Sequence, residues 1–371
     1  MNKKIRISVA LYRIFSRAYF HLPFMVIFLY KLGFSLITIE IVMAVYGLAV
    51  FTYTKLPARI KPTAYLPSKY NLLVSECIKF IGMILIIVTQ NFAGICFSQI
   101  LLGLGYGIAA GGDTRIINFH FDDDGKFQAK SNSLMFASLL IAGLVGSVLF
   151  DIDIRLPFLA SSIANVITCI VCITLPNEPG KLKTSIANKT NEKLSMQEKR
   201  LICVYCLTRG IILTYFTGFL PYYLFIDLQI PVYGFILILT SYTFLGNISS
   251  NFIAAKLKPN HAIKIMNVCL LTSILLYFFN NLSLIVIATV LLGLTSGATR
   301  PICMTGLRKI NSNISQISNI MESIYSVINI TLLVIGGILY QYYGFHIVLT
   351  LLLAVYIFYI ILNIYFSKRS V

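Results

Sequence analysis

Acidic side chains inside apolar stretches are the first residues of this 371-residue sequence that could do chemistry. Four of its 13 Asp and Glu residues lie in or at the ends of such stretches: Glu40, Glu76, Asp113 and Glu322. An unpaired charge inside a membrane costs at least ~3 kcal/mol, so each of these groups needs a partner or a function. Glu76 lies one helical step before Lys79, which predicts a structural ion pair. Glu40, Asp113 and Glu322 are candidates for carrying a proton, and the two glutamates could equally line a water-filled vestibule.

Basic side chains in the same kind of stretch could bind an anion. Arg13, Arg17 and His21 recur four residues apart, which places them on one face of a helix. Arg13 lies near enough to the membrane surface to extend its charge into water, whereas Arg17 and His21 lie deeper. Arg17, Arg209 and Arg300 facing one cavity would suit a carboxylate or phosphate on a substrate. They could equally pair with the buried acids and hold the structure together.

Aromatic side chains extend the predicted substrate site. Phe20 lies three residues after Arg17 and shares its helical face, whereas Tyr19 would point away from it. Tyr106 and Tyr215 lie in later apolar stretches, and an aromatic-lined cavity would fit an amphipathic organic solute. The residues predicted to bind substrate are therefore Arg17, Phe20, His21, Tyr106, Arg209, Tyr215 and Arg300.

Other kinds of chemistry find little support. The sequence has no phosphate-binding loop, which argues against ATP-driven transport by this chain alone, and no zinc or catalytic-triad spacing. The eight cysteines all fall in apolar stretches and are expected to be unpaired thiols. His120 beside 122–124 (DDD) reads as a solvated turn rather than a metal site. We expect no enzyme, no metal and no cofactor.

Composition identifies the surroundings of these residues. Hydrophobic residues make up 58% of the chain and charged residues 12%, far outside the range of soluble proteins. A lipid bilayer must therefore solvate much of the chain. The formal net charge of +17 is explained by membrane topology and anionic lipid head groups, so no nucleic acid is expected as a partner.

Apolar segments long enough to span a membrane recur between short polar breaks. Twelve spans are predicted, at 8–30, 36–56, 70–90, 92–113, 131–150, 156–176, 201–226, 231–255, 263–280, 283–305, 317–340 and 345–366. The break at 177–200 is polar and lysine-rich and has no apolar period. The predicted fold is thus an all-α polytopic membrane protein with six-helix halves at 1–176 and 201–371, joined by a linker at 177–200.

A glycine pattern indicates that the two halves are related. Gly103, Gly107 and Gly111 recur every fourth residue and form a bare stripe that lets a neighbouring helix approach closely. The sequence Leu-Leu-Gly-Leu around Gly103 returns 190 residues later, and Gly107 has its counterpart at the same offset in Gly297. A second match at this offset relates 146–150 to 336–340. The repeats predict a duplicated, pseudo-symmetric half.

Basic residues predict the orientation. Among 30 Lys and Arg residues, only Lys31 and Arg155 fall in the connections that follow the odd-numbered spans. Since positive residues stay on the cytoplasmic side, both termini are expected to be cytoplasmic. The chain is expected to be a monomer in the plasma membrane (the bacterial inner membrane). Its N-terminal segment is expected to be retained, because no cleavage site follows the basic start.

Four short motifs, each weak alone, occur in an informative order. They are 22–23 (LP) before 32–36 (LGFSL), 111–114 (GGDT), 156–158 (LPF) and 178–179 (EP). With twelve spans in two halves, this order resembles the drug-export-like members of the major facilitator superfamily. The resemblance implies that fold, with helix 1 lining a central cavity and the substrate near the membrane midplane.

Three signatures of that family are absent or degraded. The loop 55–61 lacks the G-x-x-x-D-R-x-G-R-R pattern, whose aspartate normally helps to hold the two halves in one state. Gln99 replaces the family's helix 4 arginine, and the helix 5 export motif is reduced to Gly143 and Gly146-Ser147. The sequence therefore assigns no antiporter subfamily.

The function predicted from these patterns is secondary active transport. Proton-coupled efflux of a small amphipathic compound, such as a drug or antibiotic-like metabolite, is the leading expectation, by alternating access. Uptake of an organic anion is the alternative, because buried arginines outnumber buried acids. A transport-inactive receptor or immunity protein on the same fold is the alternative from another class, because the gating loop is degraded. The expected partners are a small-molecule substrate, protons and the lipid bilayer.

Overall fold

The computed structural model describes residues 2–56, 61, 66–121, 126–177, 194–310 and 314–369. These residues form helices and connections, with no β-strand among them. Ten helices or unbroken helical runs in this part of the chain are long and apolar enough to cross a membrane. Each of the ten overlaps one predicted span, so the chain is an all-helical, multi-pass membrane protein.

The helices follow one another with short connections. In the first 177 residues they are α1 (Asn2–Phe15), the 3₁₀ helix η1 (Leu22–Phe24), α2 (Met25–Lys31), α3 (Leu36–Lys55), α4 (Ser68–Val88), α5 (Phe92–Ala109), α6 (Gly112–His120), α7 (Lys126–Ile152) and α8 (Leu156–Thr174). From residue 194 they are α10 (Met196–Leu213), the π-helix η2 (Thr214–Phe219), α11 (Leu220–Tyr222), the π-helix η3 (Tyr223–Asp227), α12 (Val232–Lys256), α13 (Pro259–Leu276), α14 (Leu282–Lys309), α15 (Ile314–Tyr343) and α16 (Phe345–Lys368).

Polar side chains explain where several helices begin. Asn91 and Asn281 accept hydrogen bonds from backbone N–H groups in the first turns of α5 and α14, at 2.7 and 2.9 Å. Ser195 and Glu198 form a reciprocal capping box that begins α10. Residues 196–200 of the predicted linker are therefore helical, while 178–193 lie outside the described residues.

The predicted continuous helix over 8–30 is wrong. Residues 16–21 form turns and irregular backbone between α1 and η1. Proline has no N–H group, so Pro23 cannot donate to the carbonyl of residue 19 as a helix would require. A second break separates α5 from α6 at Gly111, whose φ of +74° is a left-handed conformation that glycine adopts without strain.

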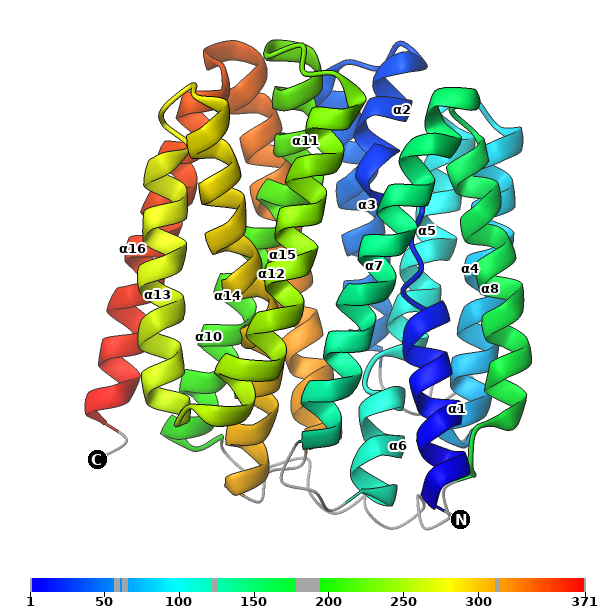
Figure 1. The fold of residues 1–371 in the computed structure, drawn as a ribbon, viewed down its shortest axis with the longest axis vertical. Helices are drawn as coiled ribbons and strands as arrows, with labels where there is room; N and C mark the ends of the chain where they lie inside the picture. The colour runs from blue at the N-terminus through cyan, green and yellow to red at the C-terminus, as the bar shows by residue number, and fades with distance from the viewer. Residues whose placement is uncertain are drawn as a thin grey trace.

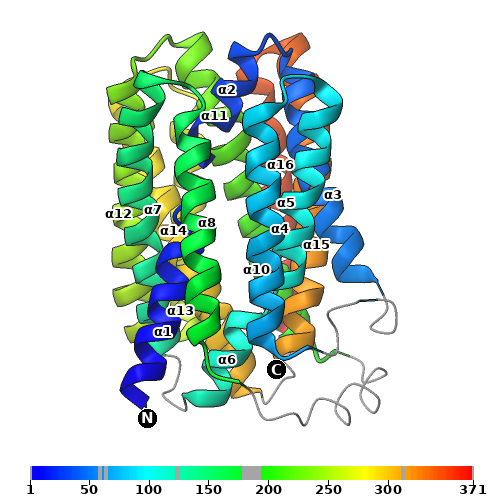
Figure 2. The same cartoon turned by 90° about the vertical axis from the view of Figure 1, so that its right-hand side faces the viewer.

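The helices gather in two groups around a central space. Figure 1 shows α1–α8 on one side and α10–α16 on the other, with both chain ends at the same end of the bundle. We call this end the termini end and the opposite end the far end. Figure 2 shows α6 at the termini end and α2 at the far end.

Glycines bring two pairs of helices into backbone contact. A methyl group on Gly103 of α5 would overlap the carbonyl oxygen of Tyr46 on α3. Gly293 of α14, 190 residues later, meets the carbonyl of Tyr242 on α12 in the same way. The repeated motif therefore makes the same kind of contact on both sides of the molecule.

Gly297→Ala is expected to lower the free energy of unfolding by about 1–3 kcal/mol, the usual range for overpacking. The added methyl group would overlap the backbone carbonyl of Gly246, which no side-chain rotation can relieve. The matched control is Gly107→Ala, whose methyl group would meet the Tyr53 side chain at 3.2 Å. Thermal unfolding of the purified variants measures the difference, and equal losses in the two would contradict the packing argument.

Helices α3 and α15 contact each other along most of their length and connect the two groups. At the far end, the Ile37 N–H donates to Gln341 Oε1 at 3.2 Å. In the middle, a methyl group on Gly47 would lie 2.9 Å from Ile330 Cγ1. Towards the termini end, the hydroxyls of Thr54 and Ser323 are hydrogen-bonded at 2.7 Å.

Candidate functional site

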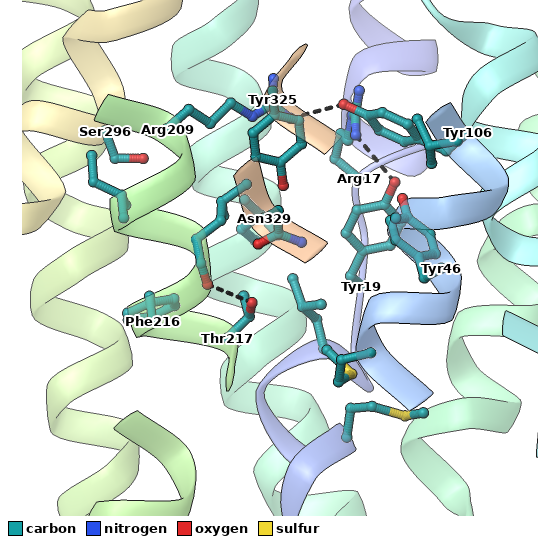
Figure 3. A pocket seen from close by; sticks show the side chains of 18 of the residues that line it. Arg17, Tyr19, Tyr46, Tyr106, Arg209, Phe216, Thr217, Ser296, Tyr325 and Asn329 are labelled. Atoms are coloured by element: carbon teal, nitrogen blue, oxygen red, sulfur yellow. Dashed lines mark hydrogen bonds between the residues drawn. The ribbon is translucent and has the colours of Figure 1, made fainter. Parts of the chain in front are cut away.

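A central cavity of about 290 Å³ is lined by side chains from both groups of helices. Figure 3 shows Arg17, Tyr19, Tyr46 and Tyr106 on the side of α3 and α5, facing residues of α10, η2 and α15. Five of the seven residues predicted to bind substrate line it: Arg17, His21, Tyr106, Arg209 and Arg300.

The two other substrate-site predictions, Phe20 and Tyr215, are wrong in placement. Because the chain is not helical over 16–21, the three-residue spacing does not put Phe20 beside Arg17. Phe20 packs with Ala142 instead, and Tyr19 lines the cavity. Tyr215 lies on the π-helix η2, where its ring packs against Tyr277 with centroids 4.4 Å apart, away from the cavity.

Arg17 lines the cavity without an acidic partner. Its Nη1 donates to the Tyr19 hydroxyl at 3.2 Å, and its guanidinium lies 5.3 Å from the centre of the Tyr106 ring. No carboxylate in the described ranges forms an ion pair with it. A guanidinium in low-dielectric surroundings is stabilised more by an anion than by phenols, so a bound anion would gain most at Arg17.

Arg209 belongs to a network that joins the two groups of helices. Its Nη1 lies 3.1 Å from Glu322 Oε1, and its Nη2 donates to the Tyr106 hydroxyl at 2.8 Å (Figure 3). Tyr205 donates to the same Glu322 oxygen at 2.8 Å and also contacts Arg209. Tyr106 lies on α5 and its partners on α10 and α15, so this phenol bridges the groups across the cavity wall.

Asp113 is shared by two arginines at the termini-end side of the cavity. Its carboxylate lies 3.1 Å from Arg13 Nη2 and 3.6 Å from Arg300 Nη2, and Arg300 also donates to Thr114 Oγ1 at 3.1 Å. The expectation that Arg13 reaches water is wrong, because its side chain is 0% exposed. The break at Gly111 starts a new helix, α6, whose first turn holds Asp113 against α1 and α14.

Lys79 is a cavity residue that the sequence did not single out as one. The predicted pair with Glu76 is confirmed at 2.5 Å, and it is fully buried on the carboxylate side. Lys79 nevertheless lines the cavity. No signal in the sequence shows which side of α4 faces the cavity, because the pair alone is compatible with either.

The cavity region carries an excess of positive charge. Five cations there meet three carboxylates: Arg13, Arg17, Lys79, Arg209 and Arg300 against Glu76, Asp113 and Glu322. The formal excess is two positive charges. Buried charges of one sign without counter-ions are costly, so the arrangement favours a negatively charged occupant.

The rest of the lining is apolar and deformable. Four methionines contribute to it: Met25, Met43, Met83 and Met135. Phe216 stacks on Tyr242 with ring centroids 3.8 Å apart, and both rings line the cavity. Methionine side chains adapt to irregular shapes, so this part of the wall suits an apolar body of variable outline.

Glu40, the third proton candidate with Asp113 and Glu322, lies apart from the cavity lining. Its side chain is 0% exposed, and neither carboxyl oxygen has a hydrogen-bond partner in the described structure. It packs between Gly218 of η2 and Gly337 of α15. Asp113 and Glu322 lie directly behind lining residues and are ion-paired.

The sequence matches no protein-family model and no curated protein sequence. The structure, in contrast, is similar to those of known transporters. The human organic anion transporter MFSD10 (TETRAN) gives a TM-score of 0.72 at 12% identity, over 97% of this chain and 99% of that one. The nucleoside transporter NupG gives 0.72 at 15% identity, over 98% of this chain and 99% of that one. A bacterial homologue of the iron transporter ferroportin, in an outward-facing state, gives 0.68 at 13% identity over 99% of both chains.

At these identities the likeness establishes the fold, which is that of the major facilitator superfamily. It does not distinguish a drug-export-like subtype.

Proposed function

We propose that this chain is a secondary transporter that carries a small amphipathic organic anion across the membrane by alternating access. The observation that carries the proposal is the charge of the cavity, where Arg17 has no acidic partner and cations exceed carboxylates by two. The anionic group would bind at Arg17, within reach of the Tyr106 and Arg209 network. The apolar body would lie against the methionines and Phe216.

The architecture proposed for this cycle has twelve spans in two halves, 1–176 and 201–371, with 177–200 as the linker. Two observations support it: the shared fold with transporters that have an organic anion, a nucleoside and iron in their names, and the glycine contacts repeated at one offset. The concentration of Lys and Arg in the loops of the termini end supports its assignment to the cytoplasm.

Glu322 is the carboxylate we propose for coupling to protons. It is bound to Arg209 and to Tyr205 directly behind the cavity wall. A proton on Glu322 would weaken its attraction for Arg209 and leave the guanidinium available to a substrate anion. Proton and anion would then bind together and move in the same direction. This favours uptake of an organic anion over the proton-driven efflux that the family resemblance suggests.

A flux experiment tests this proposal. The purified protein is reconstituted into liposomes and given aryl carboxylates and aryl phosphates, each beside its neutral amide or its quaternary ammonium analogue. We expect the anions to accumulate, faster with an acidic exterior, and the neutral and cationic analogues to be excluded. Accumulation of the cationic analogues, or of none of the compounds in vesicles that bind them, would contradict the assignment.

A further inference from the structure

Glu40 occupies an unusual position for a carboxylic acid. It lies one turn into α3 from the far end, where α3 meets η2 and α15. A methyl group on Gly218 would lie 3.1 Å from its Oε2, and one on Gly337 would lie 3.0 Å from its Cβ and Cγ. Only glycine at both positions leaves room for this side chain. The carboxyl group is thus enclosed by backbone from the second group of helices.

The enclosure offers no partner for a negative charge. Among the described residues, Leu333 and Gly337 face Glu40 from α15, Gly218 faces it from η2, and Ile37 flanks it on α3. No charged group acts on its ionisation; burial is the only influence.

The titratable side chains of the neighbouring elements are engaged elsewhere. Tyr215 packs on Tyr277, and Tyr340 donates to Asp227 at 2.6 Å. A carboxylate without a hydrogen bond or a counter-ion in such a place is unfavourable, whereas the neutral acid is tolerated.

We propose that Glu40 is a proton-binding site that stabilises the closed far end of the α3–α15 interface. In the closed arrangement the group is neutral. Separation of α3 from η2 and α15 would give it water, in which it ionises at neutral pH. Protons therefore favour the closed far end, and alkaline pH favours its opening.

The position of Glu40 also determines which compartment supplies its proton. The side chain does not line the cavity, and it lies near the far end of α3. Opening the termini end would leave the Glu40 contacts in place, so the group exchanges protons with the far-end compartment alone. It acts as a sensor of pH on one side and does not carry protons across. This inference is independent of the substrate and holds whether or not the anion assignment does.

An introduced tryptophan can report opening, because the chain contains none. Tyr30 of α2 and Tyr222 of α11 meet edge to face at the far end, with ring centroids 5.7 Å apart. In a Tyr30→Trp variant, separation of the two groups at this end would change the fluorescence. We expect one sigmoidal change from mildly acidic to mildly alkaline pH in the purified full chain. The same change is expected in oriented vesicles when only the far-side pH is altered.

Two variants at position 40 give the controls. Glu40→Leu in the Tyr30→Trp background keeps the closed contacts without a titratable group, and its fluorescence should not respond to pH. Glu322→Gln in the same background should retain the response. Infrared difference spectra supply a readout that does not depend on the tryptophan: the band of a protonated carboxyl group should disappear at alkaline pH in the parent and be missing in Glu40→Leu. A pH response that persists in Glu40→Leu, or one driven from the termini side, would overturn the proposal.

Discussion

Asp113→Asn is expected to lower the free energy of unfolding by about 3–5 kcal/mol, the range for removing one partner of a buried ion pair. Asp113 is the carboxylate that lies against both Arg13 and Arg300. Asparagine keeps the size of the side chain and removes its charge. Arg13 is 0% exposed, so it cannot turn to water for compensation. Two buried guanidinium groups would then repel each other without an intervening anion.

The effect can be separated from a general loss of packing by a second substitution. Asp113→Asn combined with Arg300→Gln removes one of the two cations and should recover part of the lost stability. Asp151→Asn, at an exposed position, is the matched control and should change stability little. Chemical or thermal unfolding of the purified variants provides the measurement. An Asp113→Asn protein as stable as the Asp151→Asn protein would show that the shared ion pair contributes nothing.

Arg17→Gln is expected to weaken binding of the transported anion by about 1.5–3 kcal/mol, the value of a charge-assisted hydrogen bond, which is roughly tenfold or more in affinity. The substitution leaves no carboxylate unpaired, because Arg17 has only tyrosine neighbours in the described structure. The stability of the protein without substrate should therefore be almost unchanged. Loss of binding with stability intact identifies an arginine whose partner is the substrate.

Arg209→Gln is the informative comparison for Arg17→Gln. It leaves Glu322 with its tyrosine bonds but without its cation, so the protein without substrate should become less stable. Arg155→Gln, at an exposed far-end position, controls for the change in net charge. Titration of an aryl carboxylate, followed by calorimetry or thermal shift, measures affinity in each variant. An Arg17→Gln protein that binds the anion as tightly as Arg155→Gln would rule out the anion site.

Features that depend on neighbours in sequence could be predicted. The apolar spans follow from composition and segment length, and the Glu76–Lys79 pair follows from helical spacing. The spacing argument failed at Phe20 and Tyr19 because it assumed a helix where Pro23 and the irregular backbone before it interrupt one. A prediction from periodicity is as good as the continuity of the helix on which it rests.

Contacts between distant segments could be anticipated only as a set of possibilities. The sequence shows that Arg17, Arg209 and Arg300 need anionic partners, but it cannot say which carboxylate approaches which arginine. Asp113 pairs with Arg13, one hundred residues away, because the left-handed Gly111 redirects the chain at the start of α6. The same limit hid Lys79 and the four methionines, whose contribution to the cavity depends on how helices rotate against each other.

The α3–α15 contact has a symmetry that bears on how the molecule can move. Glu40, Gly47 and Thr54 are seven residues apart, which is close to two helical turns, so all three lie on one face of α3. Gly47 packs on Ile330 and lies about 10 Å from each of the other two along the axis. Tilting α3 about this point lengthens one arm's contact as it shortens the other. A tilt of about 10° would move Glu40 and Thr54 by roughly 2 Å in opposite directions. With equal arms, a stiff α3 cannot release both ends at once, so a continuous leak through the protein is excluded by the geometry of a single helix.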